Sequence, residues 1–114
     1  MSWTDWRLLA TRNEWLSDFL DYNGPSCYEL ATGGARGGRI QTHYVGETKH
    51  EKDRMARYGY DGSHLSEIIH WNLKRGWNLY FHGWTLPSKE AAIAMQNRLL
   101  CRHRYDWNYL LNRD

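Results

Sequence analysis

The sequence predicts one domain of mixed α/β class, in which three strands are interspersed with helices. Residues 26–31, 40–46 and 77–84 contain the aromatic and β-branched side chains that favour strands. The segments before and between them carry apolar residues at helical spacing, and glycine or proline stands at several of the boundaries. A chain of 114 residues can bury one core but is too short for a second, separate recognition domain.

Residues 4–21 predict an amphipathic helix that precedes the first strand. Apolar residues recur there at roughly helical spacing among charged ones: Trp6, Leu9, Leu16, Phe19 and Leu20. The sequence Tyr-Asn-Gly-Pro at 22–25 breaks helices and ends this element. Trp6 and Trp15 are expected to pack against the domain rather than to stack on a ligand.

A glycine-rich connection, residues 32–39, joins the first two predicted strands. Its four glycines free the backbone without supplying packing, so we expect a flexible flap. No GxxxxGK[ST] motif follows and no helix begins at its end, which argues against a phosphate-binding loop. Arg36 and Arg39 would instead let the flap touch a nucleic-acid backbone.

A basic helix is expected to follow the second strand directly. Thr48 and Glu51 fit a capping box, which places the helix start at Thr48. Arg54 and Tyr58 are four residues apart, so they share one face of this helix.

Two further helices flank the third strand. The first is expected over residues 63–74, capped by Ser63 and closed by Gly76, with four core candidates: Leu65, Ile68, Ile69 and Trp71. Pro87 and Ser88 begin the second, which carries Gln96. Gln96 shares a largely apolar face with Ala92, Leu99, Leu100 and His103. An amide on an inward stripe needs a polar partner, so Gln96 is hard to explain as a surface residue.

Basic side chains cluster locally, although a net charge of +2 does not by itself diagnose nucleic-acid binding. One cluster lies on the helix with Arg54 and another near the end of the Gln96 helix, where Arg98, Arg102, His103 and Arg104 stand. Such clusters are either solvated helix faces or contacts to phosphate. The nucleic-acid-binding candidates are Arg36, Arg39, His43, Lys49, Lys52, Arg57 and Asn108.

The cysteines and the N-terminus predict a soluble protein of the cytoplasm. Cys27 and Cys101 show no CxxC spacing and are expected to be reduced packing residues. No signal peptide is indicated, and no apolar run approaches the ~20 residues that a membrane helix needs. The six histidines form no HxH or HExxH pair, which argues against a dedicated zinc site.

Taken in order, these residues resemble the motifs of the GIY-YIG nuclease family. Tyr28 closes a Ser-Cys-Tyr triplet, and Tyr44-Val45-Gly46 forms the second triplet. Arg54 follows ten positions after Tyr44, Tyr58 lies one turn beyond, and Gln96 stands on a later helix. The resemblance covers about residues 26–108, and its specificity lies in the ordered set rather than in either triplet alone.

The resemblance implies an α+β sandwich built on a small, mainly antiparallel three-stranded sheet flanked by helices. Residues 25–108 would form the nuclease core, and residues 1–24 would add an N-terminal helix. It further implies a stand-alone endonuclease that cuts single- or double-stranded DNA, of a restriction, phage or repair kind. Because one active site cuts one strand, a homodimer would allow both strands of a duplex to be cut.

The same resemblance implies a role for each matched residue. Tyr28 would be the general base, assisted by Tyr58; Tyr44 would orient water or phosphate. Arg54 would hold the scissile phosphate. A tyrosine base has a reference pKa of about 10, so it would need a nearby cation to favour its ionised form.

Histidine and metal positions complete the implied site. His64 lies about where some family members carry a catalytic histidine, and His43 adjoins Tyr44 and would support the site. Gln96 occupies the place of the glutamate that binds one Mg²⁺ or Mn²⁺ ion. Hard cations bind through anionic oxygen, and a neutral amide lacks that charge. Either this is a natural relative that does not cut, or Gln96 is a Glu-to-Gln variant that preserves the shape of the site.

Two other functions stay open at this stage. A non-catalytic module derived from the same fold would bind nucleic acid without cutting it, and Gln96 favours this alternative. A tryptophan-rich domain that binds proteins would use its seven tryptophans as a partner surface and show no salt-dependent affinity for DNA.

Overall fold

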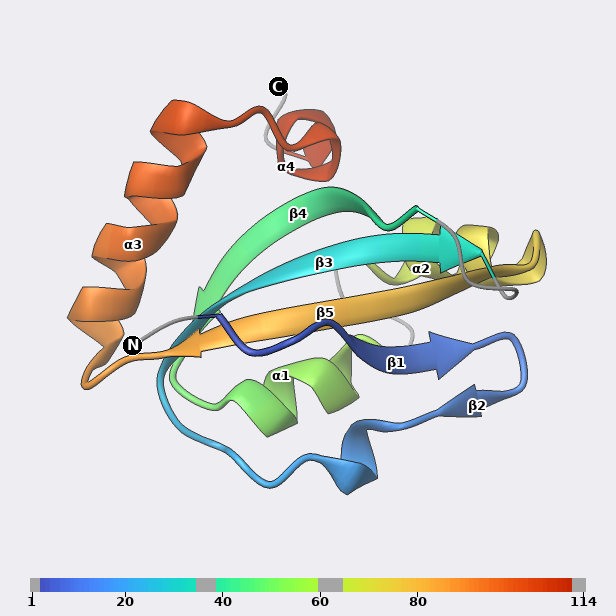
Figure 1. Ribbon diagram of the computed structural model, residues 1–114, viewed down its shortest axis with the longest axis horizontal. Helices are drawn as coiled ribbons and strands as arrows, with labels where there is room; N and C mark the ends of the chain where they lie inside the picture. The colour runs from blue at the N-terminus through green and yellow to red at the C-terminus, as the bar shows by residue number, and fades with distance from the viewer. Residues whose placement is uncertain (1–2, 35–38, 60–64, 112–114) are drawn as a thin grey trace.

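One antiparallel sheet of five strands, in the order β2-β1-β5-β3-β4, forms the centre of the molecule (Figure 1). The structure is a computed structural model and describes residues 3–34, 39–59 and 65–111. The strands are β1 (Arg7–Thr11), β2 (Glu14–Trp15), β3 (Ser26–Gly34), β4 (Gln41–Thr48) and β5 (Trp77–Thr85). The α/β class is confirmed, but the expected three-stranded sheet is wrong because β1 and β2 extend it beyond β5.

The predicted N-terminal helix is wrong. The chain instead forms β1 and β2, followed by a short 3-10 helix, Ser17–Phe19. Strand β1 pairs with β5, with Leu8 opposite Tyr80, and the turn to β2 joins Thr11 to its partner Glu14. The edge of β5 thus supplies backbone hydrogen-bond partners for residues 7–11. Because this pairing is with a distant segment, the helical spacing of residues 4–21 does not reveal it. Phe19, a presumed apolar contact of the helix, is 77% exposed.

The three predicted strands are confirmed as β3, β4 and β5. Strand β3 is central and pairs with both of the others, so that Tyr28 lies between Gly46 on β4 and Gly83 on β5. It continues to Gly34, so the first three residues of the presumed flap, 32–34, belong to the sheet. Residues 35–38 of that flap lie outside the described residues, whereas Arg39 at its end is described and exposed.

The described helices are α1 (Glu51–Arg57), α2 (Ser66–Lys74), α3 (Lys89–Arg102) and α4 (Asp106–Leu111). Helix α3 begins as expected, because the Ser88 side chain accepts a hydrogen bond from the Ala91 amide (3.1 Å). Gly76 has a φ of 91° and ends the turn after α2, also as expected. None of these helices is long and apolar enough to cross a membrane.

The capping box at Thr48 is wrong. Helix α1 begins at Glu51 after His50, and the Thr48 hydroxyl accepts a hydrogen bond from the His50 amide instead (3.0 Å). The side chain of Glu51 is buried rather than folded back onto the helix end. The expected cap of α2, Ser63, lies outside the described residues.

Two apolar clusters lie on opposite faces of the sheet. Tyr28 packs with residues of α1 and α2, including Met55 and Ile69, whereas its neighbour Cys27 packs with residues of α3. Successive residues of a strand point to opposite faces, so α3 lies across the sheet from α1 and α2. Helix α4 runs beside the outer edge of β4 (Figure 1).

Some of the residues expected to pack in the core are buried and others are exposed. Leu65 and Ile69 are fully buried and Cys27 is buried, as expected. Trp71 is 57% exposed and Cys101 is exposed, so their assignment to the core is wrong. Both lie on the solvent side of their helices, a choice that depends on how each helix is rotated against the sheet.

Candidate functional site

Three tyrosines and an arginine meet on the sheet face that α1 covers: Tyr28 on β3, Tyr44 on β4, Arg54 on α1 and Tyr58 at its C-terminal end. The hydroxyl groups of Tyr28 and Tyr58 are hydrogen-bonded to each other. The ring centroids of Tyr28 and Tyr44 lie 6.3 Å apart, as do those of Tyr28 and Tyr58. Arg54 lies one turn before Tyr58 on the same helical face, and its charge acts on all three phenols. We call these four residues the tyrosine–arginine cluster.

Gly46 makes this cluster sterically feasible. It faces Tyr28 across the β3–β4 pair. A Cβ atom at this position would lie 2.5 Å from the Tyr28 Oη and 2.9 Å from the Tyr44 Cε2. The glycine therefore leaves the space over β4 into which the Tyr28 phenol extends.

The phenols of the cluster are held in their neutral form. Burial raises the pKa of Tyr28, Tyr44 and Tyr58 above the ordinary value, while Arg54 acts in the opposite direction on each. Burial alone would lower the pKa of Arg54, but the nearby Tyr28 and Tyr58 raise it overall, so its guanidinium stays charged.

Only part of the cluster is open to a ligand. Tyr28 is 0% and Tyr58 is 1% exposed, whereas Arg54 and Tyr44 are half-buried. A ligand would therefore meet the Arg54 guanidinium and the Tyr44 side chain first. The two buried tyrosines, Tyr28 and Tyr58, lie deeper and contact these two side chains from the protein interior.

The buried carboxylate of Glu51 lies beside this cluster. From the sequence, Glu51 was expected only to cap the helix. Its Oε1 lies 1.9 Å from where a Cβ of Gly83 would stand, and Gly83 is the β5 partner of Tyr28. Burial raises the pKa of Glu51, and the charge of Arg7 partly opposes this. Gly83, which interrupts an otherwise aromatic strand, is the sequence signal that could have indicated a space reserved for this side chain.

Gln96 does not join the tyrosine–arginine cluster through any hydrogen bond within the described ranges. It is half-buried on α3, the helix that packs on the opposite face of the sheet, next to Met95 and Leu99. No group of three His, Cys, Asp or Glu side chains among the described residues could hold a metal ion. Since the amide also lacks charge, the residues present do not fit a divalent cation at this position.

The predicted nucleic-acid contacts divide by exposure. Arg39, Lys49 and Arg57 are exposed, and Lys52 is half-buried. His43 and Asn108 are buried, so they are not placed to touch a nucleic acid directly. Arg36 and the candidate catalytic residue His64 lie outside the described residues.

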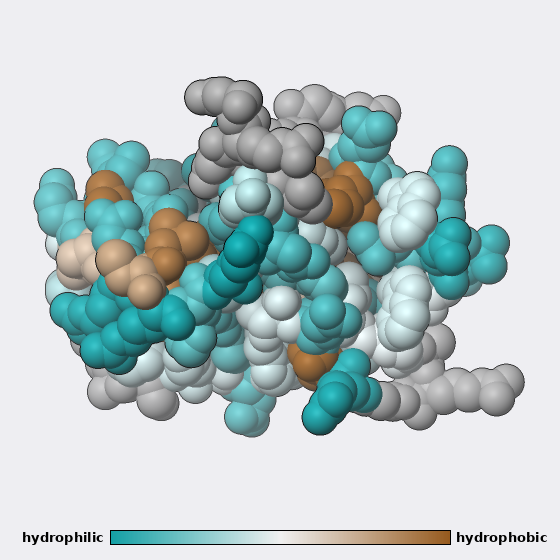
Figure 2. All heavy atoms as spheres, turned by 90° about the horizontal axis from the view of Figure 1, so that it is seen from above, coloured by the Kyte–Doolittle hydropathy of each residue, from teal (hydrophilic) through white to brown (hydrophobic). Residues whose placement is uncertain are grey.

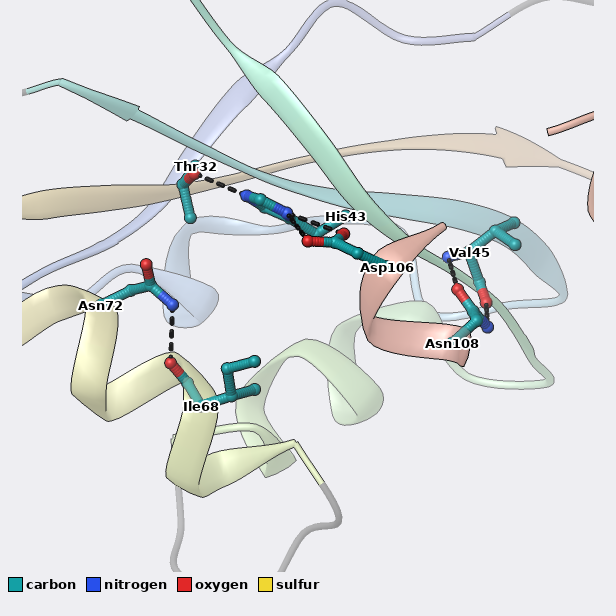
Figure 3. Close-up of polar contacts among 7 residues, drawn as sticks. All are labelled: Thr32, His43, Val45, Ile68, Asn72, Asp106 and Asn108. Carbon is teal, nitrogen blue, oxygen red and sulfur yellow. Dashed lines mark hydrogen bonds and ion pairs between the residues drawn. The ribbon is translucent and has the colours of Figure 1, made fainter. Parts of the chain in front are cut away.

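His43 and Asn108 instead attach α4 to the sheet (Figure 3). The Nδ1 atom of His43 contacts both carboxylate oxygens of Asp106 (2.9 and 3.0 Å), and its Nε2 contacts the Thr32 hydroxyl (2.8 Å). Asn108 accepts a hydrogen bond from the Val45 amide (2.8 Å) and donates one to the Val45 carbonyl (2.9 Å). These bonds satisfy the outward backbone groups of Val45 on β4, the edge strand.

A second buried polar group lies on the α3 side of the sheet. Glu29 accepts a hydrogen bond from the Tyr105 hydroxyl and contacts His82 Nε2 (2.6 Å). The His82 ring is stacked against Trp3 and against Trp6, with centroids 4.3 and 3.6 Å away. Trp6 therefore packs against the domain as the sequence predicted, although from the segment just before β1 rather than from a helix.

No known family model, curated protein or solved structure matches this chain. The function of the chain is therefore inferred from the chemistry of the residues that the fold brings together. Chief among them are Tyr28, Tyr44, Arg54 and Tyr58, which are spread over 31 positions of the sequence and lie together in space.

Proposed function

We propose that this protein binds the phosphodiester backbone of DNA at the tyrosine–arginine cluster and is an endonuclease impaired by Gln96. The observation that supports this proposal is the position of Arg54. Its charged side chain is half-buried beside the hydroxyl groups of Tyr28 and Tyr58. A guanidinium held in this way is suited to bind a phosphate through paired N–H donors.

The burial of the phenols assigns them different roles within the proposal. Tyr28 and Tyr58 are buried and their pKa values are raised, so they act by positioning Arg54 rather than by removing a proton from water. Tyr44 is half-buried and would orient the phosphate or the attacking water. Arg54 would offset the negative charge that develops on the phosphate during hydrolysis.

The chemistry of Gln96 and its position together account for the impairment in this proposal. A divalent cation, Mg²⁺ or Mn²⁺, would supply electrostatic stabilisation of the phosphate if an anionic ligand held it. The amide of Gln96 provides a neutral oxygen only, and it lies on α3, across the sheet from the cluster. We therefore expect binding without efficient cleavage.

A non-catalytic module that binds nucleic acid is the second candidate. It is favoured by the same amide and by the absence of a three-residue metal-binding group among the described residues. A protein-binding domain receives less support, because the apolar side chains visible in Figure 2 form separate patches between hydrophilic ones rather than one broad surface.

The test compares the chain with its Gln96→Glu variant on labelled single- and double-stranded DNA, with Mg²⁺ or with a chelator. Metal-dependent cutting by the glutamate form alone would support the impaired endonuclease. Salt-sensitive binding by both forms without cutting would favour the non-catalytic module.

Arg54→Gln tests the binding site itself. We expect it to weaken DNA binding at least ten-fold, because it removes the half-buried cation. Arg57→Gln, on the same helix but exposed, is the matched control and should have a small effect. Equal losses in both variants would indicate only general charge attraction and would contradict a phosphate site at Arg54.

A further inference from the structure

A hollow of about 850 Å³ opens at the end of the sheet beside α2. Its polar and aromatic lining comes from three strands, a helix and the connection before β4: Thr32, Arg39, Gln41, His43, Asn72 and Trp77. This volume lies within the range of small-molecule and cofactor sites, about 300–1,000 Å³. The hollow is separate from the tyrosine–arginine cluster but shares a strand with it, since Thr32 and Tyr28 both belong to β3.

One wall of the hollow is an aromatic ring. Trp77 is 44% exposed at the start of β5, so its ring is available to a ligand. Across the β3–β5 pair it faces Gly34, which has no side chain to cover it. Exposed rings in such positions bind planar heteroaromatic groups by stacking.

Two hydrogen-bond acceptors in the hollow are fixed by their neighbours. The Asn72 Nδ2 donates to the Ile68 carbonyl (2.8 Å), which turns the Asn72 Oδ1 towards Thr32 (Figure 3). The contact of His43 Nδ1 with the Asp106 carboxylate favours the tautomer with a proton on Nδ1, in which Nε2 accepts a hydrogen bond from the Thr32 hydroxyl. The Thr32 Oγ1 then keeps its lone pairs for a ligand.

This lining defines the chemistry of the occupant. Two fixed acceptors suit a ligand with an amino group, whose two N–H bonds can be donated together. The Trp77 ring suits a planar heterocycle, and the exposed Arg39 at the rim suits an attached phosphate. A nucleotide whose base carries an exocyclic amine combines all three features.

We propose that the hollow binds one unpaired, amino-bearing nucleobase, stacked on Trp77, with its phosphate at Arg39. This inference rests on the proposed function and names the form of nucleic acid that it acts on. Thr32 and Tyr28 are four residues apart on one strand, about 13 Å at ~3.3 Å per residue. A base in the hollow and a phosphate at Arg54 can therefore belong to the same strand, and a stacked, paired base could not enter.

Calorimetric titration with dAMP, dCMP and dTMP tests the hollow without any cleavage step. We expect dAMP and dCMP to bind at least five-fold more tightly than dTMP, which has no amino group. Trp77→Ala should weaken dAMP binding at least ten-fold, in line with stacking of ~1–3 kcal/mol per base. Trp71→Ala, which removes another exposed tryptophan outside the lining, should bind like the parent chain.

Asn72→Leu provides a second variant of similar size that leaves Trp77 in place. We expect it to reduce the preference for dAMP over dTMP, and a circular dichroism melt of each variant verifies that it is folded. Unchanged dAMP affinity in folded Trp77→Ala, or equal affinity for dTMP and dAMP in the parent chain, would overturn the proposal.

Competition experiments identify the form of nucleic acid. A single-stranded oligonucleotide should displace dAMP, and a blunt duplex of the same sequence should not. Displacement by both to the same extent would overturn the requirement for an unpaired base. Because these titrations need no activity, failure of Gln96→Glu to cut DNA would leave their outcome intact, so the two proposals fail independently.

Discussion

The hydroxyl group of Tyr28 lies over Gly46 on the neighbouring strand, where any Cβ atom would stand 2.5 Å from it. This relationship joins the two tyrosine-bearing triplets of the sequence into one packing unit, because the glycine of the second accommodates the phenol of the first. It also directs the Tyr28 hydroxyl to Tyr58, and thereby links both strands to α1.

Gly46→Ala is expected to displace the Tyr28 phenol. The added methyl group meets two aromatic side chains in a buried position, so we expect the free energy of unfolding to fall by about 1–3 kcal/mol. Urea denaturation measures this loss. Gly34→Ala is the control on the adjacent strand, since its Cβ would lie 4.0 Å from the Trp77 ring, an ordinary van der Waals contact. Similar losses in both variants would contradict the steric role of Gly46.

The hydrogen bond between Tyr28 and Tyr58 can be measured with a double-mutant cycle. Tyr28→Phe and Tyr58→Phe each remove this bond, and each should lower the free energy of unfolding by about 1 kcal/mol. The double variant should lose less than the sum, with a coupling of at least about 0.5 kcal/mol. Tyr109→Phe, at an exposed tyrosine, should change stability little. Additive losses at positions 28 and 58 would show that the two hydroxyls do not act together.

Glu51→Gln is expected to change how stability depends on pH. Burial raises the pKa of Glu51 above 4.5, so the folded state holds the proton more tightly than the unfolded state does. The carboxyl therefore favours folding at low pH, and this contribution declines as pH rises through its raised pKa. The amide does not titrate, so the variant should be more stable than the parent chain at neutral pH and lose that advantage below about pH 4.5.

Thermal melts of the Glu51 variant across this pH range provide the measurement. Glu67→Gln, at an exposed position on α2, is the control and should show no comparable change. A Glu51 variant that is less stable than the parent at neutral pH would show that the charged carboxylate stabilises the fold, against the direction expected from its burial.

Asn108→Ala is expected to expose the edge of β4. The substitution removes two hydrogen bonds to Val45, and at about 1 kcal/mol each the free energy of unfolding should fall by about 2 kcal/mol. Hydrogen exchange of the Val45 amide should become faster at the same time. Asn97→Ala, at an exposed asparagine on α3, is the control. Slow exchange at Val45 in the Asn108 variant would mean that another group protects this edge.

The sequence predicted those parts of the molecule that depend on local chemistry. The strands β3, β4 and β5 were expected because their side chains favour extended backbone, and the starts and ends of helices at Ser88 and Gly76 follow from short-range hydrogen bonding and backbone freedom. The spacing of Arg54 and Tyr58 also placed both on one helical face before any fold was known.

The N-terminal strands and the burial of several polar residues were decided by tertiary structure. The segment at Arg7–Thr11 has helical spacing, yet it pairs with β5, some 70 positions later in the sequence. His43 and Asn108 were expected to contact nucleic acid at the surface. Both are buried instead, because His43 is hydrogen-bonded to Asp106 and Asn108 to the edge of β4. Glu51 was likewise expected to cap the helix, but its carboxylate is buried because Gly83 leaves room for it.

The sequence by itself thus determined the local elements and the order of the tyrosine, arginine and glutamine positions. Tertiary structure decided which side of the sheet each position occupies, and so brought Tyr28, Tyr44, Arg54 and Tyr58 together while Gln96 lies on the opposite helix layer. The physical reason is that strand pairing and helix docking are selected by distant backbone groups and apolar faces, which local spacing does not specify.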